Sequence, residues 1–154
     1  MLRARKGKAI MDTQRSTEFD DAALKHLEFI QNIVTRMANN SFLLKGWSVT
    51  LVAAIFVLTV NNPSVYLIFI AIFPALAFWG LDAYYLRQER LFRQLYRNVI
   101  EEPDNVNSFS MNTSDYESNV QSWFDTVLSK SVLPFHGSIV STVILAIVVL
   151  LIVG

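Results

Sequence analysis

The chain has 154 residues, of which 53% are hydrophobic and 17% are charged, and its mean hydropathy is positive at +0.36. Its 13 basic and 13 acidic residues cancel, so the net charge points to no class of partner. The absence of cysteine excludes a disulfide framework, a thiolate nucleophile and a cysteine-ligated zinc site.

Two long segments without any charged residue decide the fold class. Residues 46–81 and 131–154 contain no Asp, Glu, Lys or Arg. A helix needs about 17 to 25 mostly apolar residues to cross a bilayer, and a charge near its centre costs about 2.5 to 3.5 kcal/mol. The sequence therefore predicts an all-α membrane protein rather than a soluble domain with a very apolar core.

The N-terminal part is expected to lie outside the bilayer. Residues 1–16 are interpreted as a flexible basic tail, attracted to anionic headgroups, in which Met11 is an alternative start. Residues 17–41 predict an amphipathic cytoplasmic helix, because a capping-box spacing opens it and apolar residues recur every three or four positions. We expect the polar residues 39–41 to interrupt the helix before the first span.

Residues 42–81 predict a transmembrane hairpin of two apolar arms joined by the uncharged turn 61–64. Trp47 and Trp79 lie at similar distances from this turn, as do Lys45 and Asp82, so each pair is expected at one membrane interface. Lys45 and Asp82 are interpreted either as an ion pair that locks the hairpin or as two separately hydrated charges.

Small residues spaced four apart mark one face of each span, which allows neighbouring helices to approach closely. The pairs are Gly46 with Thr50, Ala71 with Ala75, and Gly137 with Ser141. We expect these faces to pack helices together and to support a homo-oligomer, because three spans alone do not enclose an aqueous path.

Residues 82–130 are predicted to form cytoplasmic helices and a loop, followed by a third transmembrane helix within 131–154. A further helix is expected to open at Ser114, with Glu117 completing a capping box. The preceding helix carries a stripe of four arginines: Arg87, Arg90, Arg93 and Arg97. The stripe is interpreted as a topology signal, a lipid-binding surface or a site for an acidic partner. No direct nucleic-acid binding is expected, because the neighbouring aromatic residues lie on the apolar side of the helix.

The distribution of basic residues predicts the orientation. Eight Lys or Arg precede Gly46, five lie between Asp82 and Gly137, and the hairpin turn has none. By the positive-inside tendency the N-terminus and the central segment are cytoplasmic.

Enzyme chemistry is not expected. The two histidines, His26 and His136, are far apart in the sequence, and neither has a metal-ligand partner at helical spacing. A glycine-rich phosphate loop and a Gly-x-Ser-x-Gly nucleophile motif are both absent. We therefore expect no catalytic residues, no cofactor and no metal.

Several short segments between residues 27 and 97 are similar to segments of a known group of proteins. They are Leu27-Glu28-Phe29-Ile30-Gln31-Asn32, Asn40-Ser41-Phe42-Leu43-Leu44-Lys45-Gly46-Trp47, Phe78-Trp79-x-x-Asp82 and Gln88-Glu89-Arg90-x-Phe92-Arg93-x-Leu95-Tyr96. The chain resembles small bacterial multi-span membrane proteins. In layout it is similar to the two-span (SLATT-like or retron-associated) effectors of antiviral defence systems, although its third span departs from their pattern.

The resemblance implies a bacterial inner-membrane effector of abortive infection, which disrupts the membrane when a cytoplasmic sensor protein or nucleoprotein activates it. Membrane lipids would be its other partners. The alternative from another class is a non-lytic anchoring or regulatory subunit that recruits a cytoplasmic partner.

Overall fold

The computed structural model describes residues 2–61, 64–101 and 110–153. Over these ranges the regular structure is entirely helical. It consists of α1 (Leu2–Asn61), α2 (Val65–Glu101), the 3₁₀ helix η2 (Ser114–Asn119), α3 (Trp123–Val127) and α4 (Leu133–Val153). The all-α fold class is confirmed.

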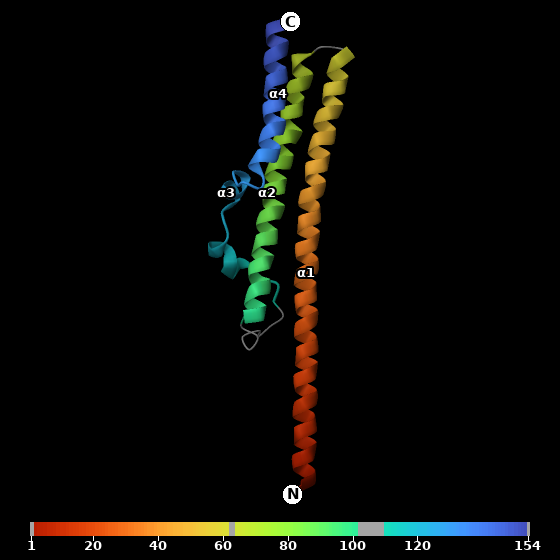
Figure 1. The fold of residues 1–154 in the computed structure, drawn as a ribbon, viewed down its shortest axis with the longest axis vertical. Coiled ribbons are helices and arrows are strands. Elements are labelled where there is room, and N and C mark those ends of the chain that lie inside the picture. The colour runs from red at the N-terminus through yellow and green to blue at the C-terminus, as the bar shows by residue number, and fades with distance from the viewer. Residues whose placement is uncertain (1, 62–63, 102–109, 154) are drawn as a thin grey trace.

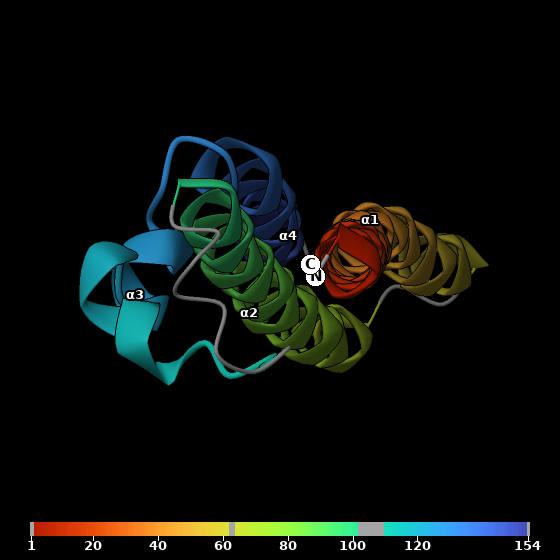
Figure 2. The ribbon, with the colours of Figure 1, turned by 90° about the horizontal axis from the view of Figure 1, so that it is seen from below.

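The three long helices form one elongated bundle. α1 and α2 run antiparallel side by side, and α4 runs back along α2, so the C-terminus lies at the same end as the α1–α2 connection (Figure 1). α2 packs on both other helices, while η2 and α3 lie against its side (Figures 1 and 2).

One half of the bundle has the surface of a membrane domain. Its core contains Val52 of α1, Ile68, Ala71 and Ala75 of α2, and Val143 and Ile147 of α4. Its outer surface is also apolar, since large side chains such as Phe73 and Ile152 are more than three-quarters exposed. Three helices are long and apolar enough to cross a membrane. The 21 residues of α4 span about 31 Å, which matches the hydrocarbon thickness of a bilayer.

The other half is formed where α1 and α2 continue beyond these spans. A second core joins Ile30 and Val34 of α1 to Leu95 and Val99 of α2, and Met111 and Tyr116 cover it. The apolar side of the helix that carries the arginine stripe therefore packs on α1.

The expected break at residues 39–41 is wrong, because α1 is helical from Leu2 to Asn61. The same helix includes residues 2–16, where a flexible tail was predicted. The helix continues through 39–41 because Ser41 faces α2 and is buried there, so the contact surface passes without a gap from Val34 to Val52. α2 is likewise continuous through Pro74.

The single helix expected from Ser114 is also wrong. The 3₁₀ helix η2 ends before Val120, whose backbone is extended (φ −121°, ψ 142°), and α3 then starts separately. Thr113 makes no side-chain cap, and Glu117 approaches Arg87 at 3.8 Å instead of completing a capping box. The side chain of Ser122 caps α3 by accepting a hydrogen bond from the backbone N–H of Asp125 at 3.2 Å.

Candidate functional site: a buried ion network where three helices meet

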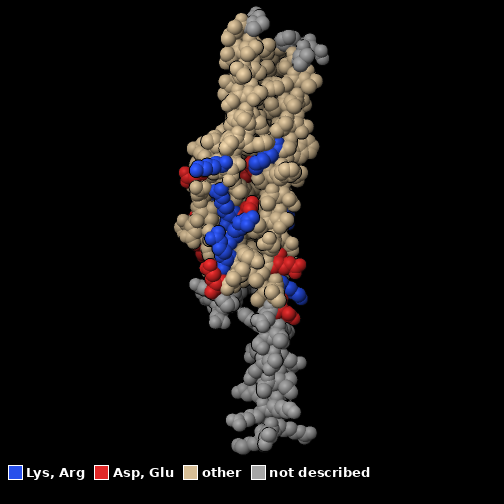
Figure 3. Space-filling view, in the orientation of Figure 1, with Lys and Arg blue, Asp and Glu red and all other residues tan. Residues whose placement is uncertain are grey.

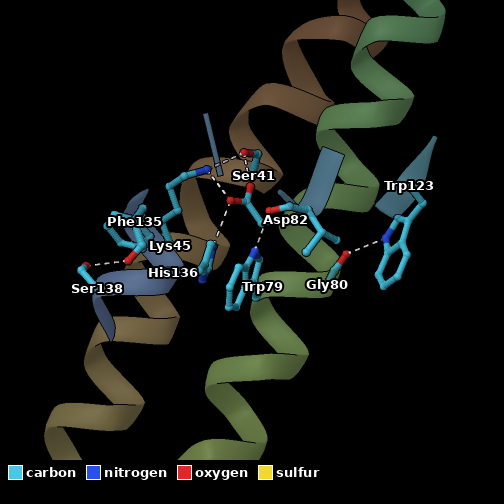
Figure 4. A network of polar contacts seen from close by, with 10 residues as sticks. Ser41, Lys45, Trp79, Gly80, Asp82, Trp123, Phe135, His136 and Ser138 are labelled. Atoms are coloured by element: carbon cyan, nitrogen blue, oxygen red, sulfur yellow. Dashed lines mark hydrogen bonds and ion pairs between the residues drawn. The ribbon is translucent and has the colours of Figure 1, made fainter. Parts of the chain in front are cut away.

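The Asp82 side chain is fully buried where α1, α2 and α4 meet. The Ser41 hydroxyl donates a hydrogen bond to the Asp82 Oδ1. The Asp82 Oδ2 lies 2.6 Å from the Lys45 Nζ and 3.0 Å from the His136 Nε2 (Figure 4). One carboxylate therefore connects all three long helices.

The sequence places these groups through simple helix geometry. Ser41 and Lys45 are four residues apart on α1, so both side chains lie on the face that contacts α2. The Lys45 ammonium also donates to the Ser41 Oγ at 3.0 Å. His136 is the fourth residue of α4, which places it at the end of that helix nearest α3.

The ring of His136 is held in a fully buried aromatic site. It stacks on Trp79 with ring centroids 6.2 Å apart and meets Phe135 edge-on at 5.1 Å. Because a carboxylate can only accept hydrogen bonds, the Nε2 atom carries the hydrogen that points to Asp82. The opposite nitrogen, Nδ1, is buried and has no hydrogen-bond partner among the residues that the structure describes.

Two tryptophans attach α3 to α2 at the same level. The Trp79 Nε1–H donates to the Val127 carbonyl at 3.0 Å, and the Trp123 Nε1–H donates to the Gly80 carbonyl at 3.1 Å (Figure 4). Glycine permits the second contact, because a Cβ at position 80 would lie 3.3 Å from the Trp123 ring. Tryptophan is enriched at the boundary between lipid and water, so this level is expected at one edge of the apolar, membrane-spanning part of the bundle.

The charges of the network balance. The Asp82 carboxylate is fully buried, while the Lys45 side chain is 25% exposed. Such a pair overcomes its desolvation cost only where the geometry is good and further hydrogen bonds satisfy the remaining lone pairs. Ser41 and His136 supply those bonds, so the site is built as a complete set.

The chemistry of this set is structural rather than nucleophilic. The Ser41 hydroxyl lies beside a lysine, but its proton is directed at Asp82 and the ammonium is held by the same carboxylate. A neutral amine acting as a base would leave the Asp82 charge uncompensated. Within the ranges that the structure describes, no three His, Asp or Glu side chains are grouped closely enough to hold a metal ion.

The ion pair between Lys45 and Asp82, one of the two alternatives predicted, is present. Sequence reasoning missed Ser41 and His136 as members. The spacing of Ser41 four residues before Lys45 was a usable signal, and so was the position of His136 near the start of an apolar helix. The common interface predicted for Trp47 and Trp79 stays a prediction; the structure adds that the Trp79 indole holds α3, whereas Trp47 is 57% exposed on the outer surface.

The four arginines of the predicted stripe lie together on α2, facing the segment after η2. Figure 3 shows the basic patch that they contribute to. Arg87 Nε and Arg90 Nη1 donate to the backbone and side-chain oxygens of Gln121 at 3.3 and 2.7 Å. Arg93 pairs with Glu89 at 2.7 Å.

Some of the predicted small-residue positions are buried in the three-helix core, and others are exposed on the outer surface of the bundle. Ala71 and Ala75 are buried in the core between the three spans. No atom of the described part of the chain lies within 4 Å of a Cβ placed on Gly46, and Thr50 and Ser141 are exposed on the outer surface. At Gly137 an added Cβ would meet only Leu133, at 3.7 Å. Ala71 and Ala75 therefore pack helices within one molecule and are not available to a second copy.

No protein-family model matches the chain, and no curated protein or solved structure matches it.

Proposed function

We propose that this protein is an effector of the bacterial inner membrane, with a cytoplasmic N-terminus, that disrupts the membrane in abortive-infection defence when a cytoplasmic sensor activates it. The observation that supports the proposal is continuity. α1 and α2 pass from the apolar bundle into the second core without a break or a linker. A displacement of their cytoplasmic halves therefore acts directly on the spans.

A displacement of the cytoplasmic halves of α1 and α2 would act on the contacts of the Asp82 network. Separating α1 from α2 there removes Lys45 and Ser41 from Asp82 and leaves charged groups in a largely apolar bundle. Unpaired charges within a membrane are costly, so they recruit water or polar groups of a neighbouring copy. Activation would in this way turn a stable single bundle into an assembly that admits water.

The test is membrane integrity in bacterial cells that express the full chain from an inducible promoter. We expect induction to depolarise cells, read with a potential-sensitive dye, and then to admit an impermeant DNA dye. Asp82→Asn removes the ion pair with Lys45, so cells expressing this variant should depolarise at a lower expression level than cells expressing the parent. Glu28→Gln changes an exposed carboxylate on α1, and this variant should behave as the parent does. Full membrane insertion with an intact potential for both variants would refute the proposal.

A non-lytic anchoring or regulatory subunit is the second candidate. It is favoured by the N-terminal part of α1, which extends beyond the end of α2 and leaves a helix free for a cytoplasmic partner (Figure 1). An intact membrane potential at high expression, combined with loss of an associated protein on deletion of residues 2–20, would favour this candidate.

A further inference from the structure

A pocket of about 290 Å³ lies between α2 and the end of η2 with the residues that follow it. Its walls include Arg90, Arg93, Gln94 and Arg97 from α2, Asn119 at the end of η2, and Gln121 just after it. We propose that it binds the phosphate group of a soluble, phosphate-bearing small molecule. This inference concerns binding alone and does not depend on the proposed function.

The pocket has a surplus of positive charge. Arg93 is neutralised by Glu89, but the contact of Arg90 is to the neutral amide of Gln121. Among the described residues no carboxylate lies within 4.0 Å of the guanidinium groups of Arg90 or Arg97, and Glu101, one turn after Arg97, forms no ion pair with it. The guanidinium groups of Arg90 and Arg97, about two turns apart on one helix face, are therefore available to an anion.

The donors present suit phosphate. A guanidinium offers a planar fork of N–H groups that binds two phosphate oxygens at once. The amide groups of Gln94, Asn119 and Gln121 add neutral donors around the same space. The pocket volume is near the lower end of the range for small-molecule sites.

The depth of the pocket favours a soluble ligand over a lipid headgroup. The headgroup layer is about 5 to 8 Å thick on each side, and the cytoplasmic edge of the apolar region is at the level of Asp82. At 1.5 Å per residue, Arg90 lies about 12 Å and Arg97 about 22 Å beyond Asp82 along α2. Of the four arginines, only Arg87, at about 8 Å, is placed at headgroup depth.

The acidic residues near the patch favour a small ligand over an extended polyanion. Glu89 lies against Arg93 and Glu117 against Arg87, and Glu101 follows the arginines on α2. A nucleic-acid backbone laid across the patch would approach these carboxylates, whereas a single phosphate group inside the pocket would not.

The experiment uses the full chain in nanodiscs of phosphatidylcholine, titrated calorimetrically with inorganic pyrophosphate at constant ionic strength. The parent protein should bind saturably. Arg90→Gln and Arg97→Gln should each weaken binding about ten-fold, because each removes charge-assisted hydrogen bonds. Arg36→Gln, which changes an exposed arginine on α1, is the matched control and should leave the affinity unchanged.

Arg90→Lys and Arg97→Lys keep the charge and remove the planar fork, so they test the site even where a glutamine variant fails to fold. Both should weaken pyrophosphate binding. No saturable binding by the parent, or unchanged affinity in both lysine variants, would overturn the proposal. Nanodiscs containing phosphatidylglycerol supply the other candidate ligand, a lipid headgroup with a net negative phosphate. If that lipid abolishes pyrophosphate binding, a headgroup fills the pocket and the assignment to a soluble ligand is wrong.

Discussion

Replacing Asp82 by Asn keeps the shape of the side chain and removes its charge. The ammonium of Lys45 then loses its counter-charge, and three donors compete for one remaining acceptor oxygen. Breaking a buried ion pair costs about 3 to 5 kcal/mol. Because Lys45 is 25% exposed and can turn toward the headgroups, the lower end of this energy range applies to the Lys45–Asp82 pair. Each lost hydrogen bond adds about 0.6 kcal/mol in a membrane protein.

We therefore expect Asp82→Asn to lower the free energy of unfolding by about 3 to 4 kcal/mol. Unfolding in mixed micelles of a mild detergent and dodecyl sulfate, followed by tryptophan fluorescence, measures this quantity. The exposed carboxylate of Glu28 provides the control, since Glu28→Gln should change the free energy by less than about 0.5 kcal/mol.

A double-mutant cycle separates the ion pair from other effects of substitution. Lys45→Met leaves the Asp82 carboxylate buried without a cation and should destabilise at least as much as Asp82→Asn. The double variant has neither charge, so its loss should be smaller than the sum of the two, with a coupling free energy of about 2 kcal/mol. Additive losses, or a change below about 0.5 kcal/mol for Asp82→Asn, would show that the network does not hold the helices together.

Three further predictions follow from the packing and the orientation. Because the chain has no cysteine, single cysteines report topology cleanly: Ser64→Cys should react with an impermeant thiol reagent added outside cells, and Ser118→Cys should not, while the reverse pattern would invert the topology. Ala75→Ile overfills the three-helix core and should destabilise by about 1 to 3 kcal/mol in the same micelle assay, whereas Gly46→Ile faces open space and should have little effect; equal losses would contradict the packing. Gly80→Val should displace the α3 tryptophan and raise protease cleavage between η2 and α4, and unchanged cleavage would show that this contact does not hold α3.

The membrane architecture could be predicted from the sequence because it depends on the order of charged, apolar and turn-forming residues along the chain. The uncharged run 46–81 with a polar turn in its middle predicts a hairpin, and the structure has helices ending at Asn61 and starting again at Val65. The similar spacing of Lys45 and Asp82 from that turn indicated a common depth and left an ion pair as one of two alternatives, and the structure shows that pair.

The rest of the fold and of the site depends on which helix faces pack against one another. The sequence of a single segment does not show this. His136 joins the site because α4 packs on α2 in one particular rotation. The continuity of α1 through residues 39–41 follows from the burial of Ser41 against α2, which outweighs the weak helix preference of its polar neighbours. The short α3 exists because two indoles fasten it to α2, not because its five residues favour a helix.

The arrangement of the Asp82 network also constrains how the chain enters the membrane during synthesis. α1 is made first and brings Lys45 to the edge of the apolar region, and Asp82 of α2 provides the opposite charge once the second arm packs against it. Insertion of the hairpin as a unit thus avoids leaving an unpaired charge at that edge. α4 contains no charged residue and brings only the imidazole of His136 to a pair that is already neutral. The third helix can accordingly join last, by docking onto a hairpin whose two opposite charges are already paired and supplying the further hydrogen bond to Asp82.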